Sequence, residues 1–322
     1  MPVSNCTSAL HLSLLCSDIG HGDEVLVPDY TFPSTALSVL YCGARPIFVD
    51  VERDTYNLDP VDLQAKITRR SKAVIPVHHF GLSADMDSIL DIAYDKRLHV
   101  IEDAACSLGA MYKSKMTGTM GDYGCFSFHA RKIITTGEGG AVVTSNKKSA
   151  EKIRSLLKFG MKAIQSESKV FVPQKFFFRG YNFKMSDINA SLGVVQLKKI
   201  SAFIKERRSL AEYYNRKLKK LDGITLPVEK KYRKHIYQSY VIVVNRDLNR
   251  NSIIESLRKK GIDCTIGTYA CSAQPVFKSK KRCQVAKGLY EHSIALPLYN
   301  GLSHREIDLV VSKLGECINE SR

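Results

Sequence analysis

The stretch Cys125–Gly140, CFSFHARKIITTGEGG, runs from an apolar, β-rich segment into a glycine-rich turn. It places a hydroxyl, a histidine and a lysine directly after a predicted strand. An open α/β sheet binds its ligands there, beyond the carboxyl ends of the strands. Lys132 can therefore point into a crevice, where burial and a nearby cation such as Arg131 favour the neutral, nucleophilic amine. Taken alone, the same residues also describe an ordinary surface lysine beside an arginine.

Short apolar runs surround this stretch on both sides. We predict buried strands at 24–27, 46–50, 73–77, 99–103, 125–128 and 140–144. Segments with helical spacing lie between some of them, at 86–96 and 149–157. This alternation is typical of an α/β fold with a largely parallel sheet.

The second half of the chain has a different pattern. A long helical segment begins after Ser186, a suitable N-cap, and keeps apolar residues on broadly one side as far as Leu218. A strand at 237–244 and helices at 252–260 and 304–317 follow. We therefore predict a large domain over 1–200 and a smaller C-terminal α+β domain over 201–322.

Composition indicates an ordinary folded protein. The chain has 322 residues, 44% hydrophobic and 25% charged. No apolar run approaches the roughly 20 residues that cross a bilayer, and residues 1–5 do not resemble a signal peptide. We expect a cytoplasmic protein with no membrane partner. The 9 cysteines are scattered without paired CxxC spacing, so we expect reduced thiols and no metal site.

The chain is strongly basic, with a formal net charge of +16. Clustered lysine and arginine can bind nucleic acid. Here the basic residues concentrate in the second half, in patterns typical of solvated helix faces and loops. We expect no nucleic-acid partner, and we note that a basic surface also suits an anionic diphosphate substrate.

Three further segments carry groups suited to one cofactor. Asp103 ends an apolar strand, where an acid could keep a pyridine nitrogen protonated, although it could equally cap a helix. Thr7 and Ser8 stand at a predicted helix start, which favours a phosphate but is also explained by capping. Phe32 could stack on a pyridine ring or simply belong to the core.

In their order along the chain, these motifs resemble the DegT/DnrJ/StrS family of sugar aminotransferases, which depend on pyridoxal 5′-phosphate (PLP). The resemblance covers almost the whole chain. The matching segments are 5–10, 22–25, 28–32, 76–81, 102–105, 126–132, 137–140, 180–182, 267–269, 274–277 and 295–298.

The resemblance implies the aspartate aminotransferase-like, PLP-dependent transferase fold and a homodimer with active sites at the subunit interface. It implies transfer of an amino group from an amino acid, usually L-glutamate, to a keto-sugar linked to a nucleotide. A related branch that deoxygenates sugars carries histidine in place of the reactive lysine, and Lys132 argues against that branch. The loop 162–175 is expected to help select the sugar.

The resemblance also implies roles for individual residues. Lys132 matches the lysine that binds the cofactor covalently and shuttles protons, and Asp103 matches the partner of the pyridine nitrogen. Asn182 matches an asparagine that contacts the phosphate of the cofactor bound in the other subunit. The full set of implied cofactor-binding residues is Thr7, Ser8, Phe32, Asp103, Cys106, Ser127, Lys132 and Asn182. His78, His129 and Tyr269 are candidates for the substrate side, with structural roles as the alternative.

Three departures from the family pattern support a second hypothesis. The family usually has glycine where Cys6 stands, and glutamine or histidine, bonded to the cofactor's phenolic oxygen, where Cys106 stands. A thiol is a weaker hydrogen bonder. Family members also carry some tens of residues, including a helix, before the motif at Asn5. The second hypothesis is a catalytically impaired or regulatory PLP-binding relative that lacks this segment.

Overall fold

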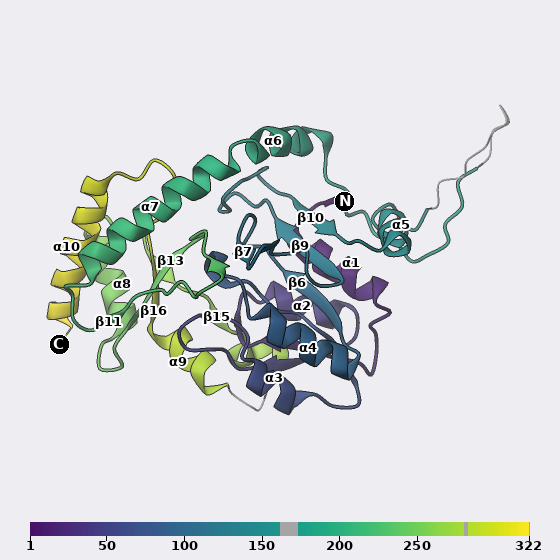
Figure 1. Cartoon of the computed structure of the whole chain (residues 1–322), viewed down its shortest axis with the longest axis horizontal. Coiled ribbons are helices and arrows are strands. Elements are labelled where there is room, and N and C mark those ends of the chain that lie inside the picture. The colour runs from purple at the N-terminus through teal and green to yellow at the C-terminus, as the bar shows by residue number, and fades with distance from the viewer. Residues whose placement is uncertain (162–172, 280–282, 322) are drawn as a thin grey trace.

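The computed structural model describes residues 1–161, 173–279 and 283–321. The two largest sheets have seven and four strands, and the long helix α7 (Ile200–Leu218) runs from one half of the molecule to the other (Figure 1). Among the described residues, no helix is both long and apolar enough to cross a membrane.

The large sheet has seven strands in the order β1-β10-β9-β6-β5-β2-β4. From β4 to β9 neighbouring strands run parallel, whereas β10 and β1 are antiparallel. All six predicted strands are present, with ends shifted by a few residues at most. The bounds are β1 Pro2–Val3, β2 Glu24–Pro28, β4 Arg45–Val49, β5 Ser71–Val74, β6 His99–Asp103, β9 Tyr123–Ser127 and β10 Gly140–Val143.

Helices cover both faces of this sheet, which explains why its strands read as continuous apolar runs. Along β2, Val25 and Val27 enter one core while Leu26 enters the other, because successive side chains of a strand point to opposite faces. The first core contains α1 (Cys6–Cys16), α2 (Ser34–Tyr41) and α5 (Lys147–Leu156), and the second contains α3 (Pro60–Lys66) and α4 (Met86–Lys96).

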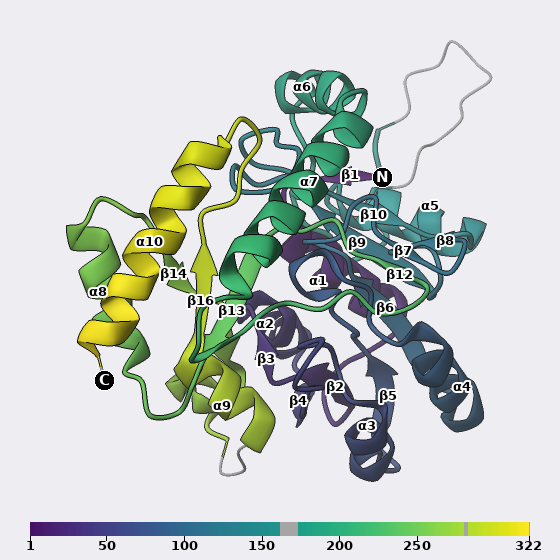
Figure 2. The ribbon, with the colours of Figure 1, turned by 60° about the vertical axis from the view of Figure 1, so that its left-hand side comes forward.

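The second sheet is smaller and antiparallel, in the order β11-β13-β16-β14. Helix α10 lies between α7 and α8 (Figure 2), and the three helices form one core with one face of β13. The bounds are β11 Ile224–Thr225, β13 Tyr240–Val244, β14 Thr265–Ile266, β16 Ser293–Leu296, α8 Arg250–Lys259, α9 Gln284–His292 and α10 His304–Glu320. The division of the chain into domains at residue 200 stays a prediction.

Two expectations from the sequence were wrong. The long helical pattern is two helices, α6 (Asp187–Leu197) and α7, because the buried stripe resumes only at Ile200 and Ile204, while α6 has no buried residue. Ser186 does cap α6. The strand expected at 237–244 begins only at Tyr240, because Tyr237 adopts a left-handed conformation with φ of 51°.

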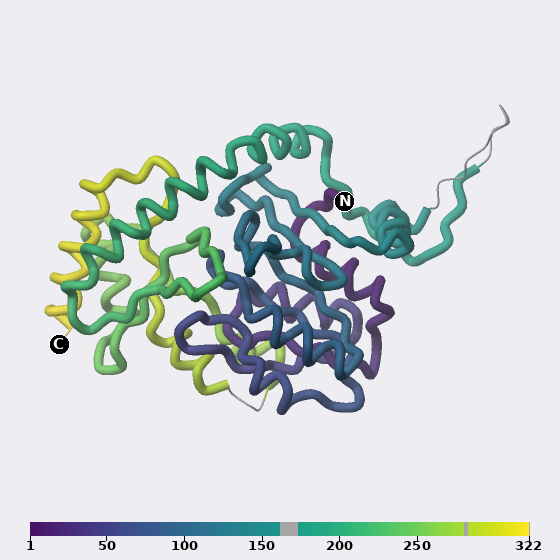
Figure 3. The backbone as a smooth tube through the Cα atoms, in the orientation of Figure 1, coloured from purple at the N-terminus to yellow at the C-terminus, as the bar shows by residue number. Residues whose placement is uncertain are grey.

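Two short strand pairs join the halves of the chain. β12 (Arg233–Lys234) pairs with β7 (Met111–Tyr112), which also pairs with β8 (Lys115–Met116). β15 (Tyr269–Ala270) pairs with β3 (Tyr30–Thr31). The second half of the chain therefore pairs short strands with strands of the first half. In contrast, residues 173–179 are exposed and extend outward beyond α5 (Figure 3).

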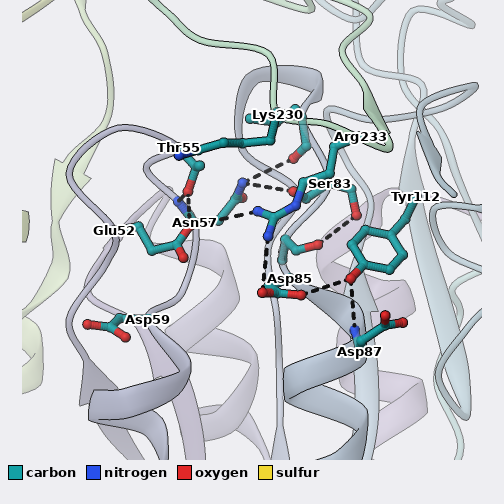
Figure 4. A network of polar contacts seen from close by, with 12 residues as sticks. Glu52, Thr55, Asn57, Asp59, Ser83, Asp85, Asp87, Tyr112, Lys230 and Arg233 are labelled. Carbon is teal, nitrogen blue, oxygen red and sulfur yellow. Dashed lines mark hydrogen bonds and ion pairs between the residues drawn. The ribbon is translucent and has the colours of Figure 1, made fainter.

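A polar network around Arg233 reinforces this junction (Figure 4). The guanidinium lies 3.1 Å from a carboxylate oxygen of Asp85 and 3.8 Å from one of Glu52. The Tyr112 hydroxyl donates to the same aspartate at 2.9 Å. Because a buried guanidinium is costly unless it is paired, the network fixes the segment around Arg233 against two loops of the first half.

Two buried histidines should make stability depend on pH. Burial lowers the pKa of both His79 and His235 to about 3, far below the roughly 6.5 of an unfolded histidine. The unfolded chain therefore gains protons first as pH falls below 6.5. Stability is complete above that pH and decreases below it, by up to about 1.4 kcal/mol per pH unit for each histidine.

Urea unfolding between pH 7 and 5 tests this expectation. The double variant His79→Asn/His235→Asn should be less stable at pH 7 but should lose less unfolding free energy on acidification. His21→Asn, at an exposed position, is the control and should keep the wild-type slope. A double variant with the wild-type slope would contradict the assignment.

Candidate active site

The candidate site forms where β6 and β9 end beside the start of α1. The parallel pairing of these strands aligns Asp103 with Cys125, so the loop after Ser127 begins next to Asp103. Helix α1 lies unusually close to the sheet here. A Cβ on Gly140 would meet the backbone of Asn5 and Cys6 at 2.6 and 2.8 Å, so only glycine permits this approach.

Asp103 is buried, and its two oxygens have separate partners. Oδ2 accepts from the Thr35 hydroxyl at 2.8 Å, and Oδ1 accepts from the Ala105 N–H at 3.1 Å and lies 3.9 Å from the Cys6 thiol. Burial raises the pKa of this carboxyl, against the opposing effects of Thr35, Ala105 and the Lys132 ammonium. A buried carboxyl with a raised pKa is typical of functional sites.

Lys132 reaches the same place from the loop between β9 and β10. Its Nζ lies 3.0 Å from the Cys106 sulfur, and Asp103 and Cys6 are close enough to affect its charge. The expectation that burial and Arg131 would favour the neutral amine was wrong. Burial does oppose the ammonium, but Cys106, Asp103 and Cys6 outweigh it and raise the pKa of Lys132, while Arg131 is exposed.

The residues predicted to hold a phosphate lie around the start of α1. Asn5 is the N-cap, and its side chain accepts from the Ser8 N–H at 2.8 Å. Ser8 is buried, with its hydroxyl 3.0 Å from that of Ser4, and Thr7 is partly exposed. Ser127, partly exposed, pairs with Gly140, the residue against which α1 packs. The first turn of a helix offers free N–H groups to an anion.

Phe32 is exposed and stands three residues before Thr35, the partner of Asp103. Its side chain is 59% exposed, and its ring is 6.2 Å from that of Tyr269 in an edge-to-face arrangement. The pairing of β15 with β3 brings these rings together, so Tyr269, from the second half of the chain, lies beside Phe32.

Asn182 is not brought into this cluster within one chain. It is exposed, bonds to the Lys184 ammonium and pairs with Lys158 next to α5. Its expected contribution to another subunit stays a prediction. Of the loop 162–175, residues 162–172 lie outside the described residues.

The two histidine candidates have different surroundings. His78 is enclosed: its Nδ1 accepts from the Ala84 N–H and its Nε2 lies 2.9 Å from the Glu102 carboxylate. It is therefore a structural residue. Glu102 also accepts three backbone N–H groups, from Gly118, Met120 and Gly121. His129 is partly exposed, and its Nδ1 accepts from the Arg131 N–H.

Sequence reasoning missed Thr35, which holds Asp103. It stands three residues after Phe32, in the first turn of α2, a helix that the sequence patterns did not predict, and its hydroxyl would locally be explained by capping. Among the described residues, no group of three or more histidine, cysteine, aspartate or glutamate side chains could hold a metal ion.

Comparison with known proteins identifies the family. The model of the DegT/DnrJ/EryC1/StrS aminotransferase family matches residues 1–315. The chain belongs to this family. GDP-perosamine synthases of Caulobacter vibrioides and Escherichia coli O157:H7 are 36% and 33% identical to it, over 98% and 99% of this chain and 84% and 85% of theirs.

The solved structures agree with the family. A Streptococcus pneumoniae protein assigned as a sugar aminotransferase, in its PLP form, matches with a TM-score of 0.93 and 26% identity, over 100% of this chain and 87% of that one. The resemblance read from the motifs is thus confirmed, as is the fold of PLP-dependent aminotransferases with its mostly parallel sheet.

The residues of the site fit this cofactor. The buried acid suits a ring nitrogen, and the amine, 3.0 Å from a thiol, suits an aldehyde. The exposed aromatic ring suits a ring face, and the helix start with nearby hydroxyls suits a phosphate.

The contact between Lys132 and Cys106 yields a prediction. Cys106→Ala should lower the pKa of Lys132, since the thiol is the main group that raises it. Acetic anhydride, which reacts with neutral amines, should then label Lys132 about tenfold faster at neutral pH, the effect of one hydrogen bond to a charged group. Mass spectrometry of cofactor-free protein measures this rate.

Cys317→Ala, a thiol change in α10, is the matched control and should leave the labelling rate unchanged. Equal rates in Cys106→Ala and wild type would contradict the electrostatic role of the thiol.

Proposed function

We propose that the chain is a PLP-dependent aminotransferase that moves an amino group from an amino acid, L-glutamate, to a keto-sugar linked to a nucleotide. The observation that carries the proposal is the convergence of Lys132 with the buried Asp103 beside the start of α1. Family membership supplies the reaction class.

The residues divide the work of this reaction. When bound, PLP supplies an electron sink and a carrier for the amino group. Asp103, anchored by Thr35, holds the proton of the ring nitrogen. Lys132 supplies the amine that binds the cofactor and moves a proton to or from the α-carbon of the donor through Nζ. The start of α1, with Thr7, Ser8 and Ser127, binds the phosphate, and Phe32 covers one face of the ring.

The sugar nucleotide is supported by the relatives. Two of them are GDP-perosamine synthases, whose name indicates a sugar carried on a nucleoside diphosphate. The net charge of +16 gives this chain a field that attracts such an anionic substrate.

We also propose that the working form is a homodimer. Helix α6 has no buried residue, yet it carries exposed apolar side chains, and further ones lie nearby in the chain. They are Ile188, Leu192, Val194, Val195 and Leu197, with Phe176, Phe177 and Phe178. An exposed apolar surface of this kind is typical of an interface between subunits, and the exposed Asn182 lies between these two groups in sequence.

Spectroscopy tests the proposed chemistry. Purified protein mixed with PLP should develop a visible absorbance band that is absent in Lys132→Ala, and L-glutamate should convert the bound cofactor to its amine form. The control, Lys259→Ala, removes an exposed lysine at the end of α8 and should keep the band. A wild-type protein that stays colourless would contradict the proposed function. A band that glutamate leaves unchanged would favour the impaired relative. Keto-sugar nucleotides can then be screened with labelled glutamate.

The homodimer has its own test. Leu192→Glu/Val195→Glu places two carboxylates on α6 and should convert a dimer to a monomer in light scattering after gel filtration, because burying unpaired charge costs several kcal/mol. Val61→Glu, at an exposed apolar residue on α3, is the control and should remain dimeric. A wild-type protein that is monomeric would rule the proposal out.

A further inference from the structure

The loop that carries Lys132 has internal bonds on both sides of it. The Lys132 N–H donates to the His129 carbonyl at 2.9 Å, and the Thr136 N–H donates to the Phe128 carbonyl at 2.9 Å. These bonds close the loop. The Arg131 carbonyl and the Ile133 N–H, on either side of Lys132, bind a side chain more than a hundred residues away in the sequence.

That side chain is Gln238, which lies just before β13 and is 7% exposed. Its Nε2 donates to the Arg131 carbonyl at 2.8 Å, and its Oε1 accepts from the Ile133 N–H at 2.8 Å. A primary amide has one acceptor and one donor side, and these partners fix which way it points. A carboxylate of the same length would lack the donor, and an aliphatic chain would lack both groups.

The backbone of Gln238 is itself held in place. Arg207 of α7, also buried, directs Nη1 to the carbonyls of Tyr237 and Gln238 at 3.2 Å each and to that of Leu298 at 3.1 Å. On the other side, a Cβ on Gly81 would lie 3.0 Å from the Gln238 nitrogen. Gly81 has a φ of +100° and contacts this segment closely, so glycine is required there.

We propose that Gln238 is a positioning residue for Lys132. By binding the peptide groups on both sides of the lysine, it fixes the direction in which the side chain leaves the backbone. Nζ is thereby held against Cys106, next to Asp103. Arg207 acts indirectly, because it holds the backbone of Gln238 in place. The inference rests on the proposed function for its use of Lys132 as the reacting amine. The pair of hydrogen bonds from Gln238 to the Arg131 carbonyl and the Ile133 N–H, called the clamp below, can be measured without cofactor.

Hydrogen exchange of the cofactor-free protein tests the clamp. In Gln238→Leu, the peptide covering 128–139 should exchange about tenfold faster than in wild type, since the Ile133 N–H loses its acceptor and the loss of one hydrogen bond of about 1.4 kcal/mol is a tenfold change. The control is Leu314→Ala, a cavity in the core of α10 that weakens the fold without touching the loop.

The exchange results have clear consequences. Faster exchange that is confined to Gln238→Leu supports the clamp. Unchanged exchange in Gln238→Leu, or an equal increase in Leu314→Ala, overturns it.

A second variant gives a readout that a purely structural role would not change. Gln238→Glu keeps an acceptor for the Ile133 N–H but places a carboxylate oxygen against the Arg131 carbonyl. Protonation restores a donor. Exchange of 128–139, corrected for the intrinsic pH dependence, should therefore slow toward the wild-type value as pH falls. A pH profile parallel to wild type overturns the proposal.

Cofactor binding separates the clamp from the proposed function. PLP should add to Gln238→Leu at least several-fold more slowly than to wild type, followed by the visible absorbance, while Leu314→Ala should match wild type. Equal rates in Gln238→Leu and wild type overturn the positioning role. A wild-type protein that never develops the absorbance overturns the proposed function instead, and the cofactor-free exchange results still decide whether the clamp exists.

Discussion

The parallel pairing of β6 with β9 is the constraint on which the site depends. Parallel strands end at the same edge of a sheet, so the register that places Asp103 beside Cys125 also places Lys132 near Asp103. The Glu102 carboxylate consolidates this edge. It is buried, bonds His78 and accepts three backbone N–H groups from residues 118–121, just before β9. Hydrogen bonds from the His78 side chain and these N–H groups keep its pKa low in spite of burial, so it remains the acceptor that this turn requires.

The pKa of Lys132 differs from that of a lysine that is buried without charged neighbours. Isolated in the same position, Lys132 would tend to lose its proton, because burial disfavours the ammonium. The neighbouring acid and thiols reverse that tendency. Cys106 therefore has a measurable consequence, because its sulfur lies in direct contact with the amine. The amine and the acid stabilise each other's charged forms.

The second half of the chain contributes more than a separate small unit. Tyr269 reaches Phe32 through a two-residue strand, the network around Arg233 binds two loops of the first half, and Gln238 binds the backbone on both sides of Lys132. Each contact crosses between segments far apart in sequence. The position of the loop that carries Lys132 is therefore coupled to the packing of α7 and the second sheet.

The sequence by itself determined six of the seven strands of the large sheet, the family and the identity of Lys132, Asp103 and the residues at the start of α1 as site candidates. These depend on local patterns: apolar runs, a lysine after a strand, hydroxyls at a helix start. Only the tertiary structure decided which groups surround them. The hydroxyl of Thr35 looks locally like that of a helix cap, and Gln238 has no local signal, because the partners of both residues lie far away in the chain. The pKa of Lys132 was predicted in the wrong direction for the same reason, since its charge is governed by side chains that only folding brings within contact.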